Sequence, residues 1–364
     1  MNLKKFQAVK YRNIEECDIS FSNGINVLCG SNAQGKTNVL EGIYFFSRGK
    51  SFRGAGDKEL LKFGEEAFSL GIEFEDKRRS HTLKYIFDGK ERKRYHNGVK
   101  ENKVSDVLGY FKAVIFYPEH LQLIKGGPSE RRNFLDVAVA QWRPEYYKYY
   151  SDYKKVLENR NFLLKCMQRG MYTDPAETEV WNEAMARTAA KINIMRREYL
   201  EGLEKYASVL QRDISGKREN IEVCYISDVD GENEEDTEKK YREILSENIK
   251  RECEAGVSLF GIHRDDIDIR INGKSSRYFA SQGQQRSTVL SLKMAEGEMC
   301  FSSSGEYPVF LLDDVLSELD ERRRDYILSL GSEKQFIITM CEDCIHSQNK
   351  NVITAEMGSF REYR

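Results

Sequence analysis

The chain has 364 residues, of which 32% are charged and 40% are hydrophobic, and its formal net charge is −2. This composition is typical of a globular protein, and no apolar run approaches the roughly 20 residues that a membrane-spanning helix needs. Residues 1–6 lack the apolar core of a signal peptide, so we expect a cytoplasmic protein with no membrane partner. Because the whole chain is not basic, any contact with nucleic acid must come from local patches.

Three short strands open the predicted fold. Residues 3–9 and 17–21 alternate between apolar and polar side chains, and the turn between them contains Arg12. Residues 25–29 follow as a continuous apolar run, which is typical of a buried strand. This third strand leads directly into a glycine-rich loop.

The glycine-rich loop matches the phosphate-loop pattern G-x-x-x-x-G-K-[ST]. Residues 38–46 behind it carry apolar side chains near helical spacing, so the loop has the strand and the helix that the motif requires. The two glycines let successive backbone N–H groups point inward, and these donors and the helix N-terminus form an anion site. We therefore predict a nucleotide-binding loop made of Gly30, Ser31, Asn32, Ala33, Gln34, Gly35, Lys36 and Thr37.

A region rich in positive charge follows the first helix. Residues 68–74 and 82–87 are typical of antiparallel strands, and Asn97-Gly98 is a strong hairpin-turn signal. Such a region could follow a phosphate backbone, and an ordinary exposed hairpin is an equally good interpretation. The candidate DNA contacts in it are Arg78, Arg79, Arg92, Lys93 and Arg94. Residues 112–116 predict one more apolar strand.

The middle of the chain has a helical pattern. A helix is expected to begin near Glu130, and apolar side chains recur at helical spacing over residues 146–164 and 181–210. The stripe lasts only about four heptads, so it indicates packing inside a lobe and not a long coiled coil. Residues 221–225 predict a strand, and residues 241–253 predict one more helix.

Sheet character returns in the last third of the chain. Residues 267–271 predict a strand, and a glycine turn then opens a helix that runs to about residue 299. Four apolar residues, 309–312, end in the carboxylates Asp313 and Asp314, and residues 335–339 form a final strongly β-like run. A buried strand that ends in acids suits a Mg²⁺-nucleotide site opposite the phosphate loop.

The expected roles at this site follow from phosphoryl-transfer chemistry. Lys36 would reach the β- and γ-phosphates of ATP, and the hydroxyl of Thr37 would hold Mg²⁺ together with Asp313. Asp314 would orient the attacking water or accept its proton, so Asp314 and Lys36 are the expected catalytic residues. Arg12 is expected to join the nucleotide-binding residues.

A second helix start has a phosphate-ready geometry. The segment Ser281-Gln282-Gly283-Gln284 precedes a helix, and the first phosphate loop already serves the triphosphate within one subunit. A second such helix end suggests that it contacts the phosphates of a nucleotide bound by another subunit of a dimer. At these residues the chain resembles the ABC-type ATPase heads, because the segment is similar to their signature motif. Ser317 and Asp320 resemble their D-loop, whereas Thr339 stands where such heads often carry a histidine.

The resemblance extends to one family of these heads. The whole chain looks like the RecF family on the strength of Ser51-Phe52-Arg53, Tyr117-Pro118-Glu119-His120-Leu121, residues 125–136, Gly261-Ile262-His263-Arg264-Asp265-Asp266 and Ala280-Ser281-Gln282-Gly283-Gln284-Gln285-Arg286. It implies an α/β fold: an ABC-type P-loop ATPase head in which lobe I has a mixed sheet with helices and lobe II is an inserted helical lobe. The expected parts are residues 1–125 of lobe I, residues 126–255 of lobe II, and residues 256–364 of lobe I with the signature motif.

The resemblance also implies a function. It implies an ATP-dependent homodimer that binds gapped, single-stranded or junction DNA, cooperates with RecO and RecR in loading the recombinase RecA, and supports the SOS response. We expect slow, DNA-stimulated ATP hydrolysis, because Asp314 is shorter than the glutamate usual there in transporter heads. Three alternatives stay open: the ATP-binding subunit of a membrane transporter, an SMC-like tether, which would need longer coiled coils, and an ATP-binding DNA scaffold without turnover.

Overall fold

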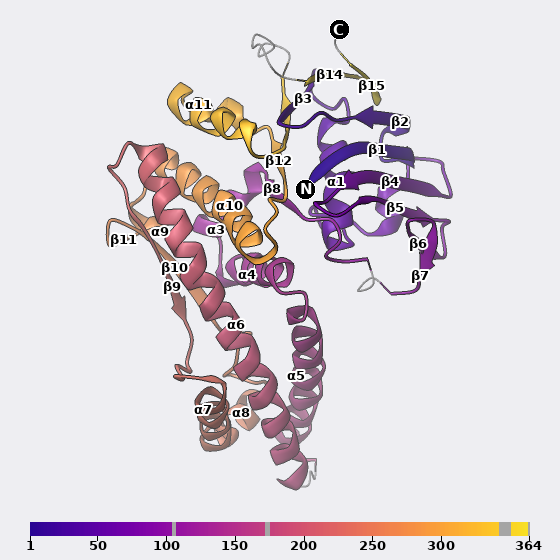
Figure 1. Ribbon diagram of the computed structural model, residues 1–364. Coiled ribbons are helices and arrows are strands. Elements are labelled where there is room, and N and C mark those ends of the chain that lie inside the picture. The colour runs from indigo at the N-terminus through magenta and orange to yellow at the C-terminus, as the bar shows by residue number, and fades with distance from the viewer. Residues whose placement is uncertain (104–106, 172–174, 342–350, 363–364) are drawn as a thin grey trace. The chain divides into compact units, whose positions relative to one another are not determined.

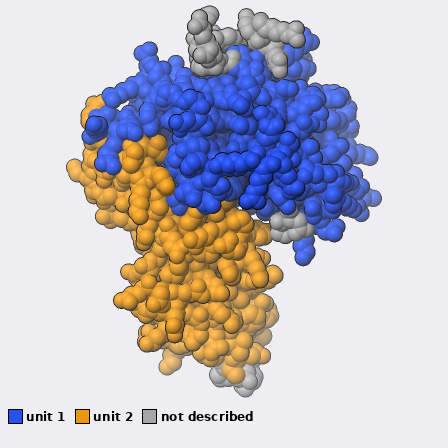
Figure 2. All heavy atoms as spheres, in the orientation of Figure 1, with its two compact units in different colours: residues 1–120, 212–217, 286–364 blue, residues 121–211, 218–285 orange. Residues whose placement is uncertain are grey.

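The computed structural model describes residues 1–103, 107–171, 175–341 and 351–362, and it divides the chain into two compact units. Unit 1 holds residues 1–120, 212–217 and 286–364, and unit 2 holds residues 121–211 and 218–285 (Figure 2). The sequence analysis expects residues 256–285 in lobe I, whereas the structure places them in unit 2. The physical reason is strand pairing, because β10 (Asp266–Ile271) lies antiparallel to β9 (Ile221–Ile226) in a sheet of unit 2.

An antiparallel sheet forms one side of unit 1 (Figure 1). Its side chains alternate between buried and exposed, so one face joins the core and the other faces solvent. Phe6 and Ala8 lie on the buried face of the first strand, and Gln7 between them points outward. The strand order is β2 (Ile14–Ser20), β1 (Asn2–Tyr11), β4 (Phe68–Glu75), β5 (Ser80–Phe87), β6 (Arg92–His96) and β7 (Val99–Glu101).

The second sheet of unit 1 is parallel except at one edge. Its inner strands are buried throughout, which explains why they appear in the sequence as continuous apolar runs. The order is β15 (Ser359–Glu362), β14 (Asn351–Glu356), β3 (Ile25–Cys29), β13 (Phe336–Met340), β12 (Val309–Asp313) and β8 (Ala113–Phe116). The sequence analysis assigns no strands to residues 351–362.

One helix of unit 1 contacts both sheets. Helix α1 (Lys36–Arg48) packs on β1 and β4 of the first sheet and on β8, β12 and β13 of the second. Ten of its residues are buried, including Leu40 and Ile43. The parallel order also brings the carboxyl ends of β3, β13 and β12 to one edge, where α1 begins. Shorter helices described in this unit include α2 (Asp57–Leu60), η2 (Pro118–Leu121), η3 (Leu316–Glu318), α11 (Glu321–Ser329) and η4 (Leu330–Ser332).

Unit 2 is mainly helical. Helices α5 (Tyr146–Gln168) and α6 (Pro175–Ser215) lie side by side in opposite directions, because Arg160 contacts Asn182 and Tyr146 contacts Arg196. At 1.5 Å per residue α5 is about 35 Å long and α6 about 60 Å, so the paired part of the two helices is limited to the length of α5. The other elements are α3 (Gln122–Lys125), α4 (Pro128–Trp142), α7 (Glu234–Glu247), α8 (Ile249–Ala255), β11 (Lys274–Ser275) and α9 (Ser276–Phe279); α10 (Gln282–Ser304) begins in unit 2 and continues in unit 1. Among the described residues, no helix is long and apolar enough to cross a membrane.

Candidate nucleotide-binding site

The phosphate loop connects β3 to α1 and depends on its two glycines. Gly30 has a φ of 152°, and a Cβ there would lie 2.3 Å from the carbonyl oxygen of Ala355. Gly35 has a φ of 98°, and a Cβ there would lie 2.8 Å from the side-chain oxygen of Asn13. The positive φ at both positions disfavours a side chain, and at Gly30 the backbone carbonyl of Ala355 also leaves no space for one. The loop can therefore present its N–H groups at the start of α1.

Lys36 is held against this loop. Its Nζ donates a hydrogen bond to the carbonyl of Gly30 and a second one of 2.8 Å to the carbonyl of Ser31. The residue is 9% exposed, so its charged end lies within the loop and not in bulk solvent. An ammonium group in this position fits a phosphate anion, because the loop carbonyls offer only neutral acceptors.

The expected metal ligands lie together at the edge of the second sheet. The hydroxyl of Thr37 and the hydroxyl of Thr339 each donate a hydrogen bond of 2.8 Å to Oδ1 of Asp313. Burial raises the pKa of Asp313, and the hydrogen bonds from Thr37 and Thr339 oppose this shift. A carboxylate beside a threonine hydroxyl is a donor set that suits Mg²⁺, which keeps several of its own waters. The residues present therefore fit the metal that a nucleotide would bring.

Thr339 also fixes the position of the next acid. The backbone N–H of Asp314 donates to the hydroxyl of Thr339 over 2.8 Å, and Asp314 has a φ of 51°. The hydroxyl of Ser317 donates to the carboxylate of Asp314 over 3.1 Å and lies 2.9 Å from its carbonyl. The Asp314 side chain is exposed, so it can reach a water molecule at the site edge. Asp320 caps α11 by accepting the N–H of Arg323 over 2.9 Å.

Arg12 is anchored beside the loop. Its guanidinium donates hydrogen bonds of 2.9 and 2.8 Å to the two carboxylate oxygens of Glu41, which is fully buried. Burial alone would raise the pKa of Glu41, but hydrogen bonds from Arg12 and Ser51 outweigh it and hold the pKa below its usual value. Arg12 is therefore a pre-positioned cation, and only part of its surface is open to a ligand.

The sequence analysis missed Arg53 as a site residue. Its guanidinium donates to the side chain of Asn38 in α1 over 3.0 Å, and its charge acts on Asp313. The signal that could have found it was the basic loop after the first helix, in which Ser51-Phe52-Arg53 lies. The structure brings that loop back to α1 through the hydrogen bond from Ser51 to Glu41.

The signature segment lies in unit 2, and it caps α10. The Ser281 hydroxyl accepts a hydrogen bond of 3.3 Å from the N–H of Gln284. The Gln284 side chain in turn accepts one of 2.9 Å from the N–H of Ser281. This reciprocal pair is a capping box, which satisfies two backbone N–H groups and orders the start of α10. Gln282 is exposed and Gly283 half-buried, and Gln284 also donates to Glu219 over 3.0 Å.

The predicted DNA contacts do not form one patch. Arg78 and Arg79 lie in the turn between β4 and β5, whereas Arg92 begins β6 at the other end of β5, about 25 Å away. Arg92 pairs with Asp57, and Arg94 lies over the ring of Tyr85 at 5.6 Å. Among these five cations only Arg78 and Arg79 are exposed with no ion pair to a described residue.

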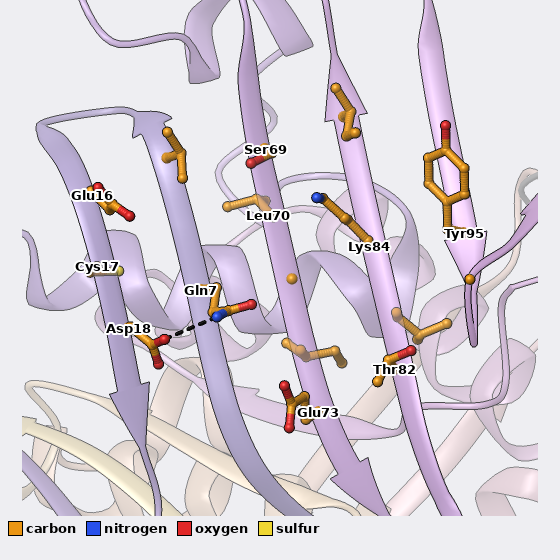
Figure 3. A pocket seen from close by; sticks show the side chains of 16 residues that line it. Gln7, Glu16, Cys17, Asp18, Ser69, Leu70, Glu73, Thr82, Lys84 and Tyr95 are labelled. Atoms are coloured by element: carbon orange, nitrogen blue, oxygen red, sulfur yellow. Dashed lines mark hydrogen bonds between the residues drawn. The ribbon is translucent and has the colours of Figure 1, made fainter.

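The sheet also separates the cations of β6 by face. Lys93 lies opposite Ile86, and Tyr95 opposite Lys84, on the outer face. That face is hollow around Gly71, which has no side chain, and Lys84 and Tyr95 line the hollow (Figure 3). Its other end carries acids, including Asp18, which accepts a hydrogen bond of 3.0 Å from Gln7. The hollow is therefore mixed in charge, which does not favour a long nucleic-acid strand.

The phosphate loop, the acid-ended strand beside it and the capped helix start define the class, an ABC-type P-loop ATPase head. Residues 2–359 match the family model described as the RecF/RecN/SMC N-terminal domain. The chain is 38% identical to the DNA replication and repair protein RecF of Geobacillus kaustophilus (strain HTA426), over 99% of this chain and 97% of that relative. It is 39% identical to RecF of Clostridium novyi (strain NT), over 93% and 92% of the two chains. The chain belongs to the RecF family.

Solved structures agree with this assignment. The structure of the recombination mediator protein RecF–ATP in the RecFOR pathway matches with a TM-score of 0.92 and 33% identity, over 100% of this chain and 97% of that one. The Smc head domain of Pyrococcus furiosus, with a TM-score of 0.57 and 16% identity over 99% and 95% of the chains, shares only the fold. The expected fold class and the resemblance to the RecF family are both confirmed.

Proposed function

We propose that this chain is an ATP-dependent DNA-binding protein of recombinational repair and replication. The observation that carries the proposal is the cluster of Thr37, Asp313 and Thr339 at the end of the phosphate loop. It supplies the oxygen donors that a Mg²⁺-nucleotide requires at the point where the loop and Lys36 would hold its phosphates. The names of the relatives, which are replication and repair proteins, support the biological part of the proposal.

ATP acts in this proposal as the link between two copies. The phosphate loop and Arg12 of one copy hold the nucleotide, and Ser281 to Gln284 of the second copy approach its γ-phosphate. Ser317 and Asp320 belong to the same contact region. The capping box orders the start of α10, and Ser281 and Gln282 there are exposed, which supports this role.

Hydrolysis is the step that releases the dimer. Asp314 orients the attacking water, and Lys36 neutralises charge that develops on the phosphates. Thr37 and Asp313 would hold a Mg²⁺ ion, which would supply further positive charge there. Asp314 is one methylene shorter than a glutamate and is engaged by Ser317, which supports slow turnover. DNA stimulates this turnover by favouring the dimer.

DNA with a gap or with a junction between single and double strands is the proposed substrate. A structural relative is described as a recombination mediator in the RecFOR pathway, which supports RecO and RecR as partners in loading a recombinase and in supporting the SOS response. The protein would meet its DNA in the cytoplasm.

Two variants test the nucleotide site. Lys36→Met should lose triphosphate affinity and keep its far-UV circular dichroism spectrum, because the ammonium contacts only the loop. Retained ATP-dependent dimerisation in Lys36→Met would contradict the assignment.

Asp314→Asn should bind ATP but lose single-turnover hydrolysis. Equal and negligible turnover in wild type and Asp314→Asn would instead support a scaffold that binds ATP without hydrolysis.

A further inference from the structure

A strained and exposed methionine lies in the turn between β14 and β15. Met357 is 85% exposed and has a φ of 47°, and Gly358 after it has a φ of 78°. Two successive positive φ values define a hairpin turn that favours Asn, Asp and Gly, whereas a long apolar side chain there is unfavourable. A methionine is therefore an unfavourable residue at this position in a single copy of the chain. A contact with another molecule would explain why an apolar side chain stands there.

This turn is attached to the phosphate loop. The N–H of Met357 donates to the side-chain oxygen of Gln34, and the N–H of Gly358 donates to the Gln34 carbonyl over 3.2 Å. Gln34 immediately precedes Gly35. The Met357 side chain therefore projects into solvent at the rim of the nucleotide loop, on unit 1.

Unit 2 carries a second exposed apolar group next to its own half of the proposed site. Tyr278 is 74% exposed and Phe279 is 71% exposed at the end of α9. Ser281 follows Phe279 by two residues, which corresponds to at most about 7 Å along the chain. Neighbouring aromatic side chains with so much exposure are typical of a surface that contacts another molecule.

We propose that Met357 of one copy packs against Tyr278 and Phe279 of a second copy when ATP joins the two. This inference rests on the proposed function. If Gln34's loop and Ser281 of the second copy hold the same triphosphate, the apolar groups that lie next to each of them converge on the same region. A thioether beside an aromatic ring is a favourable contact, and two-fold symmetry repeats it on the other side of the dimer.

A second copy explains why both exposed groups lie beside parts of the proposed nucleotide site. Single-stranded DNA could stack on Tyr278 or Phe279, but its contacts do not require Met357 and the two aromatic residues to meet only when ATP is bound. The contact would also make the ATP-bound dimer more stable than phosphate contacts alone, because burial of an aromatic side chain is favourable.

Cross-linking of mixed variants tests the contact. Met357→Cys with one affinity tag is mixed with Phe279→Cys carrying another, and a short bismaleimide is added with Mg²⁺ and a slowly hydrolysed ATP analogue or with ADP. We expect a covalent species carrying both tags only with the ATP analogue. Each variant alone, and wild type with its native cysteines, gives the background. A mixed species no more abundant than this background would overturn the contact.

Dimer affinity supplies the second readout. Met357→Asn should make the monomer more resistant to urea, because Asn suits the turn, and yet weaken the ATP-dependent dimer. Phe279→Ser should weaken the dimer about tenfold or more, since its ring is buried twice per dimer. Phe162→Ser, on the equally exposed Phe162 of α5, should leave the dimer unchanged. If both contact variants dimerise like wild type, this contact is wrong while the proposed function stands; if wild type itself stays monomeric with ATP, both are wrong.

Discussion

Gly30 and Gly35 determine whether the phosphate loop can form. Each has a positive φ, and each leaves room for a neighbour that a Cβ would displace: the carbonyl of Ala355 for Gly30 and the side chain of Asn13 for Gly35. The two neighbours come from different parts of the sequence, so the loop is held by the strands around it. The conformation of the loop is thus a property of unit 1 and not of eight residues alone.

Replacement of Gly30 tests this dependence. Gly54→Ala is a matched control, because Gly54 also has a positive φ of 77° but no heavy atom within 4 Å of the point where a Cβ would lie. We expect Gly54→Ala to lower the free energy of unfolding by about 1 kcal/mol. Gly30→Ala should lower it by about 2 kcal/mol more, because the Ala355 carbonyl must move. Chemical denaturation measures both values, and equal losses would show that the loop is less constrained than its contacts indicate.

The site residues were predictable only where a local motif exists. Lys36, Thr37 and Asp313 follow from short patterns, whereas the parts played by Thr339 and Arg53 depend on long-range contacts. Thr339 reaches Asp313 because β13 lies between β3 and β12 in the sheet. A single sequence does not specify that strand order, so the contact between the threonine and the acid could not be predicted.

At the scale of elements, the hairpin of β6 and β7 forms where Asn97-Gly98 predicts a turn. The function suggested for this region was less predictable. Neighbouring cations in a strand point to opposite faces, so Lys93 is separated from Arg92 and Arg94. The sequence pattern shows the charge but not the ion pairs that already neutralise part of it.

Salt dependence can rank the cations of this region. Arg78→Gln combined with Arg79→Gln should reduce the salt slope of DNA affinity by about two, if these exposed arginines contact phosphates. Arg92→Gln combined with Lys93→Gln should change it less, because Asp57 and Asp88 already pair with them. Fluorescence anisotropy with gapped DNA at several salt concentrations measures the slopes. An unchanged slope in both double variants would place the DNA on another surface.

A partly buried histidine connects α5 to the loop before β10. The Tyr153 hydroxyl lies 2.7 Å from Nδ1 of His263, and Nε2 of His263 lies 3.1 Å from the Ser258 carbonyl. These partners fit the neutral ring, with Nε2–H donating to Ser258 and Nδ1 accepting from Tyr153. Burial is the main cause that lowers the pKa of His263 to about 4.

Unit 2 should therefore lose stability in acid. Because the folded-state pKa of His263 lies below the usual 6.5, the unfolded chain binds the proton first as the pH falls. The free energy of unfolding should decrease between pH 6.5 and about 4, by about 3 kcal/mol from this group. His263→Gln should be less stable at pH 7 and should lack this part of the pH dependence. Urea titrations at several pH values in that range measure the free energy of unfolding. If it depends on pH equally in wild type and variant, the assignment to His263 is wrong.

At the scale of the whole molecule, the sequence predicted the class of fold and the family. The motifs are spread over residues 30 to 320, and together they are far more specific than any one of them. The boundary near residue 285 was not predictable, because it depends on the pairing of β9 with β10. The strands β14 and β15 were not predicted from the sequence. The contact between Ala355 of β14 and Gly30 of the phosphate loop joins distant parts of the sequence, so it could not be predicted either.

The central claim is that the nucleotide joins two copies of this chain. Sedimentation velocity of the wild-type protein with Mg²⁺ and either ATP or ADP, with and without gapped DNA, tests it most directly. We predict a monomer with ADP and a dimer with ATP, and we predict that Ser281→Arg binds ATP but stays monomeric. A wild-type protein that sediments identically with ATP and with ADP would contradict the account.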